Sequence, residues 1–83
     1  MYTILISGYA KRQIKKIDKQ YHRQIKKAIA SLINDPRPQG YIKLKDREAY
    51  RIRTGDYRII YEIHDKTVEV VVVDVGHRKD IYQ

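Results

Sequence analysis

Cysteine is absent from the 83 residues of this chain, which excludes disulfides, thiol nucleophiles and thiolate metal sites. The three histidines, His22, His64 and His77, are scattered and show no recognised metal-ligand spacing. No apolar run approaches the ~18–20 residues of a membrane-spanning helix, and the N-terminus lacks the basic and apolar regions of a signal peptide. We therefore expect a cytoplasmic protein with no metal site and no cofactor.

Acidic residues are scarce in the first third of the chain. Residues 1–34 hold eight basic residues and one acid, Asp18, whereas residues 35–83 hold ten basic and nine acidic residues. A polycationic segment of this kind attracts phosphate backbones through counterion release, without reading sequence by itself. The whole chain is 42% hydrophobic and 34% charged, an ordinary globular composition, and its length predicts one small domain spanning residues 1–83.

The N-terminal part of the chain has the pattern of a strand followed by two helices. Residues 2–6 are β-branched and aromatic and predict a short strand, after which Ser7 can cap a helix. The apolar positions then fall at helical spacing in two phases: Ala10, Ile14, Ile17 and Tyr21, followed by Ile25, Ala28, Ile29, Leu32 and Ile33. The phase change predicts a break near residues 18–21 and an end at Asp35-Pro36. One continuous helix over residues 9–34 is the alternative.

Beyond a loop at residues 36–40 the period of the pattern changes from helical to alternating. Apolar and polar residues alternate over 42–45, 50–53 and 57–63, and the run 68–75 is almost continuously apolar. Residues 54–57 and 64–67 have the composition of turns. The sequence therefore predicts an α+β fold with an N-terminal strand, a two-helix hairpin and a three- to four-stranded, mainly antiparallel sheet packed on the helices.

The first of these turns fixes a register that gathers arginines. A two-residue turn at residues 55–56, with glycine first, places Arg53 opposite Arg58 and Arg51 opposite Ile60. The arginines then share one face of the sheet, and the opposite face, formed by Tyr50, Ile52, Ile59 and Tyr61, packs under the helices. Like charges directly opposite each other destabilise a sheet by a few tenths to about 1 kcal/mol, so stability alone does not explain them. A solvated arginine face is the plain alternative.

The C-terminal part adds further groups to the same region. A second tight turn at residues 65–66 would put Val71 and Val73 on the arginine face, giving a partly apolar floor with a cationic rim. Gly76 is expected to permit a sharp change of direction, after which His77, Arg78 and Tyr82 follow. Taken singly, a surface histidine and an anchoring tyrosine are the simpler interpretations, but together these residues suggest a site.

A cluster of guanidinium groups without paired carboxylates suits one kind of chemistry. Such groups hold a phosphodiester and stabilise the extra charge of its pentacovalent transition state. RNA carries its own nucleophile, the 2′-hydroxyl. A protein that aligns the ribose and phosphate, neutralises the oxyanion and supplies a proton donor can therefore cleave RNA without a metal ion.

The chain resembles the RelE/ParE superfamily of type II toxins, and within it the RelE branch of ribosome-dependent mRNA endonucleases. The resemblance covers the opening strand, the basic helical hairpin ending in 34–36 (NDP), and the segments 43–45 (KLK), 50–61 (YRIRTGDYRIIY) and 75–82 (VGHRKDIY). It implies a toxin that cleaves mRNA in the ribosomal A site by 2′-hydroxyl attack, leaves a 2′,3′-cyclic phosphate and inhibits translation. A ParE-like gyrase poison and a non-catalytic RNA-binding module are the alternatives.

The resemblance also implies roles for single residues. Arg58 and Arg78 would contact the scissile phosphate, Arg78 as a candidate proton donor, and Tyr82 would orient or stack on the substrate nucleotide. Arg51 and Arg53 occupy positions that are lysines in some members.

This difference bears on the general base. An arginine, with a pKa above about 12, cannot act as a base, so Arg51 and Arg53 would hold phosphate charge or stabilise the 2′-alkoxide. The base is then unassigned, and His77 is the natural alternative, because the ordinary pKa of histidine is near ~6.5.

The implied partners are the ribosome with its mRNA and an acidic, RelB-like antitoxin, in a toxin–antitoxin hetero-oligomer without a membrane. The positive charge of the N-terminal segment agrees with both, because it suits an A-form RNA backbone and an acidic chain. The residues expected to bind RNA are Lys11, Arg12, Lys15, Lys16, Lys19, Arg23, Lys26, Lys27, Lys43 and Lys45.

Overall fold

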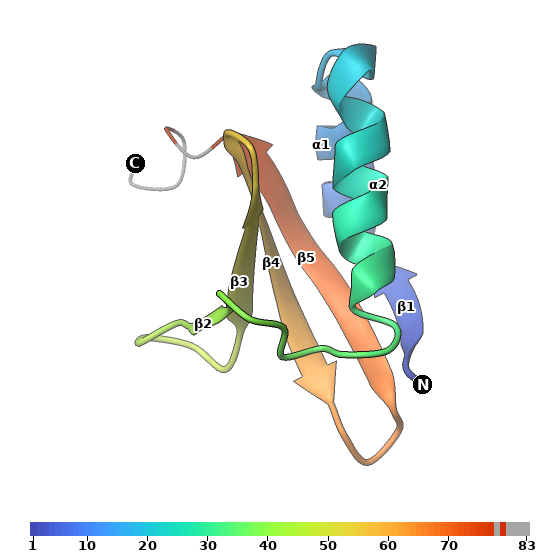
Figure 1. The fold of residues 1–83 in the computed structure, drawn as a ribbon, viewed down its shortest axis with the longest axis vertical. Helices are drawn as coiled ribbons and strands as arrows, with labels where there is room; N and C mark the ends of the chain where they lie inside the picture. The colour runs from blue at the N-terminus through green and yellow to red at the C-terminus, as the bar shows by residue number, and fades with distance from the viewer. Residues whose placement is uncertain (78, 80–83) are drawn as a thin grey trace.

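A computed structural model describes residues 1–77 and residue 79 of the chain. Two helices lie on one side of a five-stranded sheet with the strand order β1-β5-β4-β3-β2 (Figure 1). The elements are β1 (Thr3–Ile6), α1 (Gly8–Lys16), a 3-10 turn (Lys19–Tyr21), α2 (His22–Ser31), β2 (Ile42–Lys43), β3 (Tyr50–Thr54), β4 (Tyr57–His64) and β5 (Glu69–His77). The predicted α+β fold is therefore confirmed.

The helical hairpin begins and breaks where the sequence predicts. The Ser7 hydroxyl accepts a hydrogen bond from the Ala10 backbone N–H at 3.0 Å and so caps α1. The Asp18 carboxylate accepts one from the Gln20 N–H at 3.1 Å and starts the 3-10 turn. This second cap separates α1 from α2, so the continuous helix over residues 9–34 does not form.

The core lies between the helices and the sheet face that they cover. β1 pairs parallel to β5, and the other neighbouring strands pair antiparallel. The buried cluster comprises Ala10, Ile25, Ile29, Leu32, Ile52, Ile59, Tyr61, Val70, Val72 and Val75, with Tyr50 partly buried against it. The predicted apolar face of the β3–β4 hairpin is thus confirmed, and alternation along the strands places Arg51, Arg53 and Arg58 on the other face.

The β3–β4 hairpin has the predicted register. Arg53 is paired with Arg58, and Arg51 with Ile60. Gly55 takes a φ of 59°, whereas Asp56 does not have a positive φ, which fits a two-residue turn with glycine first.

The prediction of a second tight turn, at residues 65–66, is wrong. His64 pairs with Glu69, so the loop between β4 and β5 has four residues, and Val68 within it takes a φ of 55°. A β-bulge then shifts the register between Ile60 and Tyr61. As a result Asp74 and Gly76, rather than Val71 and Val73, stand opposite Ile60 and Arg58.

The expectation for Gly76 is also wrong. This glycine lies within β5, is paired with Arg58 and has no positive φ, so it makes no turn. Because Gly76 has no side chain, it leaves room for the guanidinium of Arg58 beside β5. No helix in the described part of the chain is long and apolar enough to cross a membrane.

Candidate phosphate-binding site

Arg58 is the one charged residue among the buried positions described, with 5% of its surface exposed. Its guanidinium does not point along β4 but lies across β5, where Nη1 donates a hydrogen bond to the backbone carbonyl of His77 at 2.7 Å. Nη2 lies 3.9 Å from Oδ1 of Asp74. A Cβ atom on Gly76 would come within 3.2 Å of Nη1, so the missing side chain of Gly76 leaves the space that the guanidinium occupies.

A hollow of about 460 Å³ opens beside Arg58, between α1 and β5. It combines two cations, two carboxylates, an amide and aromatic rings within one small volume. Its lining residues are Tyr9, Gln13, Lys16, Ile17, Asp18, Tyr57, Arg58, Asp74, Val75, Gly76 and His77. A hollow of this composition can hold an anionic group against Arg58 and a ring against the aromatic side chains.

His77 is fixed by two contacts at the end of β5. Its ring meets the Tyr57 ring edge-on, with centroids 5.5 Å apart, and Tyr57 packs in turn on Tyr21 at 5.2 Å. The backbone N–H of Lys79 donates to His77 Nδ1 at 3.2 Å. These two contacts orient the imidazole at the end of β5. Burial raises the pKa of Tyr57, which keeps its phenol protonated.

Arg51 and Arg53 line a different hollow, of about 630 Å³, between α2 and β3. Lys27 and Gln24 of α2 complete its cationic and polar side, and Gln24 Nε2 donates to the carbonyl of Thr54 at 3.1 Å. The Nε atom of Arg51 is buried and has no hydrogen-bond partner among the described residues. With Lys27, Arg51 and Arg53 in its lining, this hollow also has the positive charge to attract an anion.

The structure thus divides the predicted arginine cluster. The three arginines share one face, as predicted, but the Arg58 side chain lies at the β5 side with His77, whereas Arg51 and Arg53 lie at the β3 side. Arg58 is buried beside an acid and is not part of an exposed cationic rim over an apolar floor. Arg78 and Tyr82, the remaining predicted catalytic residues, lie outside the described residues.

The ten predicted RNA-binding residues are all exposed. Lys16 lines the hollow at Arg58, and Lys27 lines the hollow at Arg51 and Arg53. Lys26 instead borders an apolar hollow of about 310 Å³ between β1 and the helices. Lys43 pairs with Glu48 at 3.4 Å. The predicted RNA-binding residues thus border three different hollows or lie elsewhere on the surface.

Sequence reasoning missed Gln13 and Asp74. Gln13 Nε2 donates to Asp74 Oδ1 at 2.9 Å, and Gln13 Oε1 accepts from the backbone N–H of Val75 at 2.8 Å. One signal could have identified Asp74: it is a lone acid in the apolar run from Val70 to Val75, and a charge in a half-buried strand requires a partner. The helical pattern of α1 gives no comparable signal for Gln13.

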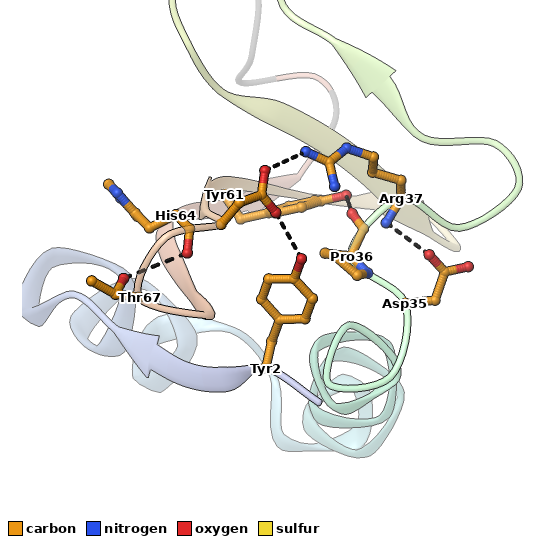
Figure 2. Close-up of polar contacts among 8 residues, drawn as sticks. Tyr2, Asp35, Pro36, Arg37, Tyr61, His64 and Thr67 are labelled. Atoms are coloured by element: carbon orange, nitrogen blue, oxygen red, sulfur yellow. Dashed lines mark hydrogen bonds and ion pairs between the residues drawn. The ribbon is translucent and has the colours of Figure 1, made fainter.

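A second polar cluster lies at the opposite end of β4, around the loop that leads to β5. Figure 2 shows Tyr2 and Arg37 pointing toward one carboxylate. The hydrogen bonds identify it as that of Asp65. The Tyr2 hydroxyl donates to Asp65 at 2.7 Å, and Arg37 Nη2 donates to it at 3.0 Å. The buried Tyr61 hydroxyl donates to the carbonyl of Pro36 at 2.7 Å. These contacts tie the N-terminus and the loop after α2 to the sheet.

Comparison with protein families identifies one match over nearly the whole chain. The family described as the ParE toxin of the type II toxin–antitoxin system parDE matches residues 4–82. Toxin RelG of Mycobacterium tuberculosis is 29% identical over 84 residues, which cover 99% of this chain and 97% of RelG. The mRNA interferase toxin RelE of Escherichia coli is 28% identical over 72 residues, covering 84% of this chain and 76% of RelE.

Solved structures share the fold. The toxin–antitoxin complex RelBE2 of Mycobacterium tuberculosis matches with a TM-score of 0.84 and 25% identity, covering 93% of this chain and 98% of that one. The intact RelBE toxin–antitoxin complex of E. coli matches with a TM-score of 0.80 and 26% identity, covering 93% and 96%.

Proposed function

Since the chain belongs to the ParE toxin family of type II toxin–antitoxin systems, on its RelE branch, we propose that it is an endoribonuclease that cleaves mRNA in the ribosomal A site. The proposal takes its reaction from the relatives named mRNA interferase. The proposed reaction leaves a 2′,3′-cyclic phosphate on the cleaved mRNA. By cleaving mRNA, the protein would inhibit translation in the cytoplasm.

The main support for the proposal comes from the surroundings of the Arg58 side chain. A buried guanidinium that is held over a glycine and lies beside a hollow has the features of a preorganised anion site. Because such a group is already desolvated and oriented, it stabilises developing negative charge without reorganising during the reaction. Arg51 and Arg53, on the same face, can hold the neighbouring backbone phosphates.

The proposed step is an in-line displacement at phosphorus. The 2′-oxygen loses its proton and bonds to phosphorus, the bond from phosphorus to the 5′-oxygen breaks, and the leaving oxygen takes up a proton. Arg58 stabilises the charge on the phosphoryl oxygens. The guanidinium of Arg78 is the candidate donor to the leaving oxygen. The group that accepts the 2′ proton is not assigned, and His77 is the candidate for it.

The proposed partners follow from charge and from the relatives. The exposed lysines and arginines of α1 and α2 would bind ribosomal RNA, with an affinity that falls as salt rises. The relatives RelBE of E. coli and RelBE2 of M. tuberculosis are toxin–antitoxin complexes. We therefore propose an acidic, RelB-like antitoxin that binds this chain in a hetero-oligomer.

The test is cleavage of a defined mRNA bound to ribosomes, with the new ends mapped at nucleotide resolution. We expect a cut in the A-site codon and a 2′,3′-cyclic phosphate end, and no cut when the scissile nucleotide carries a 2′-deoxyribose. Arg58→Ala should slow cleavage by about 10²–10³-fold while ribosome binding is kept. Arg47→Ala, which removes an exposed arginine of the β2–β3 loop, is the matched control and should cleave normally.

Two results would contradict the proposal. One is intact mRNA after incubation of programmed ribosomes with the unmodified protein. The other is equal cleavage of the ribose and 2′-deoxyribose substrates, because that would exclude the 2′-hydroxyl as the nucleophile.

A second candidate function is suggested by the family description, which names the ParE toxin. A ParE-like protein would act on DNA gyrase instead of on mRNA. Supercoiling assays separate the two functions, since only a gyrase poison would trap cleaved DNA in the presence of gyrase.

A further inference from the structure

The Arg58 side chain depends on β5 for its orientation. Gly76 is its partner across the sheet, and the guanidinium occupies the space above this glycine. On the far side, the carbonyl of His77 accepts a hydrogen bond from Nη1 at 2.7 Å. The direction of the guanidinium therefore depends on groups of the neighbouring strand.

Asp74 lies two residues before Gly76 on the same face of β5. Its Oδ1 atom is 3.9 Å from Arg58 Nη2, and its side chain is 25% exposed, against 6% for that of Arg58. A carboxylate at this distance attracts the guanidinium, and the attraction is stronger in a partly buried setting than in water. Asp74 therefore restrains the end of the guanidinium that the His77 carbonyl does not hold.

Gln13 of α1 fixes Asp74 in turn. Its amide makes two hydrogen bonds, donating from Nε2 to Asp74 Oδ1 at 2.9 Å and accepting at Oε1 from the Val75 N–H at 2.8 Å. Since β1 pairs with residues 69–72 of β5, Val75 lies beyond the stretch that β1 covers, and the Gln13 side chain satisfies its N–H there. Because the donor and the acceptor of the amide are both engaged, its orientation is determined.

Resting on the nuclease function proposed above, we propose that Gln13 and Asp74 are positioning residues that hold the Arg58 guanidinium over Gly76 in the orientation that receives the scissile phosphate. The contacts run from α1 through Gln13 to the carboxylate of Asp74, and from there to Arg58. Neither residue needs to touch the RNA.

The charge of Asp74 distinguishes this role from a purely structural one. A carboxylate beside a phosphate site weakens phosphate binding by repulsion, so Asp74 is a disadvantage for affinity. If its function is orientation, its removal should slow the chemical step while RNA binding stays the same or becomes tighter. A purely structural contact would instead lower thermal stability and leave the cleavage rate of the folded protein unchanged.

The first part of the test measures how fast the Arg58 guanidinium rotates in the free protein. NMR of protein labelled with 15N-arginine reports the rotation of the guanidinium about its Cζ–Nε bond. We expect at least a threefold faster rotation for Arg58 in Asp74→Ala. Gln13→Glu should have the same effect, because glutamate can still accept from Val75 but cannot donate to Asp74. Asp46→Ala, an exposed carboxylate of the β2–β3 loop, is the control and should leave the Arg58 signal unchanged.

The second arm measures single-turnover cleavage on programmed ribosomes, with saturating and limiting toxin. We expect Asp74→Ala and Gln13→Glu to lower the maximal rate about tenfold. Half-saturation should come at the same or a lower toxin concentration for Asp74→Ala, which removes a negative charge, and not for Gln13→Glu, which adds one. The double variant Gln13→Glu/Asp74→Asn, in which the amide at position 74 can donate to the carboxylate at position 13, should recover part of the rate.

The outcomes distinguish failure of the positioning role from failure of the nuclease function. An Arg58 rotation rate unchanged in both variants overturns the positioning role, and so does faster rotation with a normal cleavage rate. A loss of thermal stability that accounts for the entire loss of cleavage also overturns it. If the unmodified protein cleaves no ribosome-bound mRNA, the nuclease function fails, and the NMR arm alone decides whether the pair holds Arg58.

Discussion

Two arginines at opposite ends of the β4–β5 hairpin are held in contrasting ways. Arg37, with its side chain 39% exposed, makes a 3.0 Å ion pair with Asp65, and its guanidinium carbon lies 5.9 Å from the centre of the Tyr50 ring. Arg58, with its side chain 6% exposed, stands 3.9 Å from its carboxylate and donates to a backbone carbonyl. The exposed arginine has the shorter ion pair, and the buried one lies beside a hollow.

The contrast separates structural from chemical use of the same side chain. At the Arg37 end, the polar groups satisfy one another and connect three segments of the chain (Figure 2). At the Arg58 end, a desolvated cation is fixed next to space that a ligand can enter. We therefore expect substitutions at the first end to change stability, and substitutions at the second to change activity.

After removal of Arg58 itself, the largest expected effect is at Gly76. A side chain at this position would enter the space of the Arg58 guanidinium, since even Cβ would lie 3.2 Å from Nη1. Gly76→Val suits a strand by propensity, so the fold should persist while the guanidinium is displaced. Because a displacement of about 1 Å can cost about 10²-fold in rate, we expect mRNA cleavage on ribosomes to fall by roughly that factor.

The control for this prediction is a second glycine. Gly8→Ala adds a Cβ atom whose nearest contact is the flexible end of Arg12, at 3.4 Å, and alanine suits a helix better than glycine. Cleavage by this variant should be normal. Equal activity of the Gly76→Val variant and the unmodified protein would mean that the position of Arg58 is not critical.

An intermediate effect is expected at Tyr61, on stability alone. Tyr61→Phe leaves the carbonyl of Pro36 without the 2.7 Å hydrogen bond from the phenol. An unsatisfied buried polar group costs about 1–3 kcal/mol, so the free energy of unfolding in urea should fall by that amount. The cleavage rate should not change. A variant that is as stable as the unmodified protein but inactive would reverse the roles assigned to the two ends.

The same residue predicts a dependence on alkaline pH. Burial raises the pKa of Tyr61 to about 12, above its value in the unfolded chain, so the unfolded state releases this proton first. The contribution to stability is therefore complete below pH ~10 and is lost as pH rises from ~10 towards 12. Unfolding curves of the unmodified protein and Tyr61→Phe should converge over this range, and parallel curves would contradict the assignment.

The smallest effect is expected at Asp65. Its hydrogen bond from Arg37, followed by that from Tyr2, lowers the pKa of this carboxyl. A lowered pKa stabilises the fold above the unfolded-state pKa, and this stabilisation is lost as pH falls through the folded-state value. Asp65→Asn should therefore cause a slight loss of stability at neutral pH, smaller than that of Tyr61→Phe, because exposed ion pairs contribute little. The difference should vanish in acid, and a difference that grows in acid would contradict this account.

The sequence predicts the hairpin from β3 to β4 better than the one from β4 to β5. Gly55 dictates a two-residue turn with a defined register, and the alternation around it then assigns both faces. The loop before β5 instead places Val68 in a conformation that β-branched residues rarely adopt. Together with the bulge after Ile60, this shifts the partners of β4 in a way that alternation cannot reveal.

This change in the β4–β5 register limits what the sequence could predict about the candidate site. The pattern places Arg51, Arg53 and Arg58 on one face, but it does not give the direction of a side chain within that face. That direction depends on Gly76 and Asp74 being opposite Arg58 and Ile60, which follows from the four-residue loop together with the bulge. The contact of Gln13 with Asp74 joins residues 61 positions apart, and no local pattern encodes it.

The most direct test of the central claim compares Arg58→Ala and Arg37→Ala on the same programmed ribosomes. Cleavage of the A-site codon and the free energy of unfolding are measured for each variant. We predict that the Arg58→Ala variant no longer cleaves the A-site codon but remains folded and bound to the ribosome. The Arg37→Ala variant should cleave at the normal rate. Cleavage that survives in Arg58→Ala, or is lost to the same degree in both variants, would contradict this prediction.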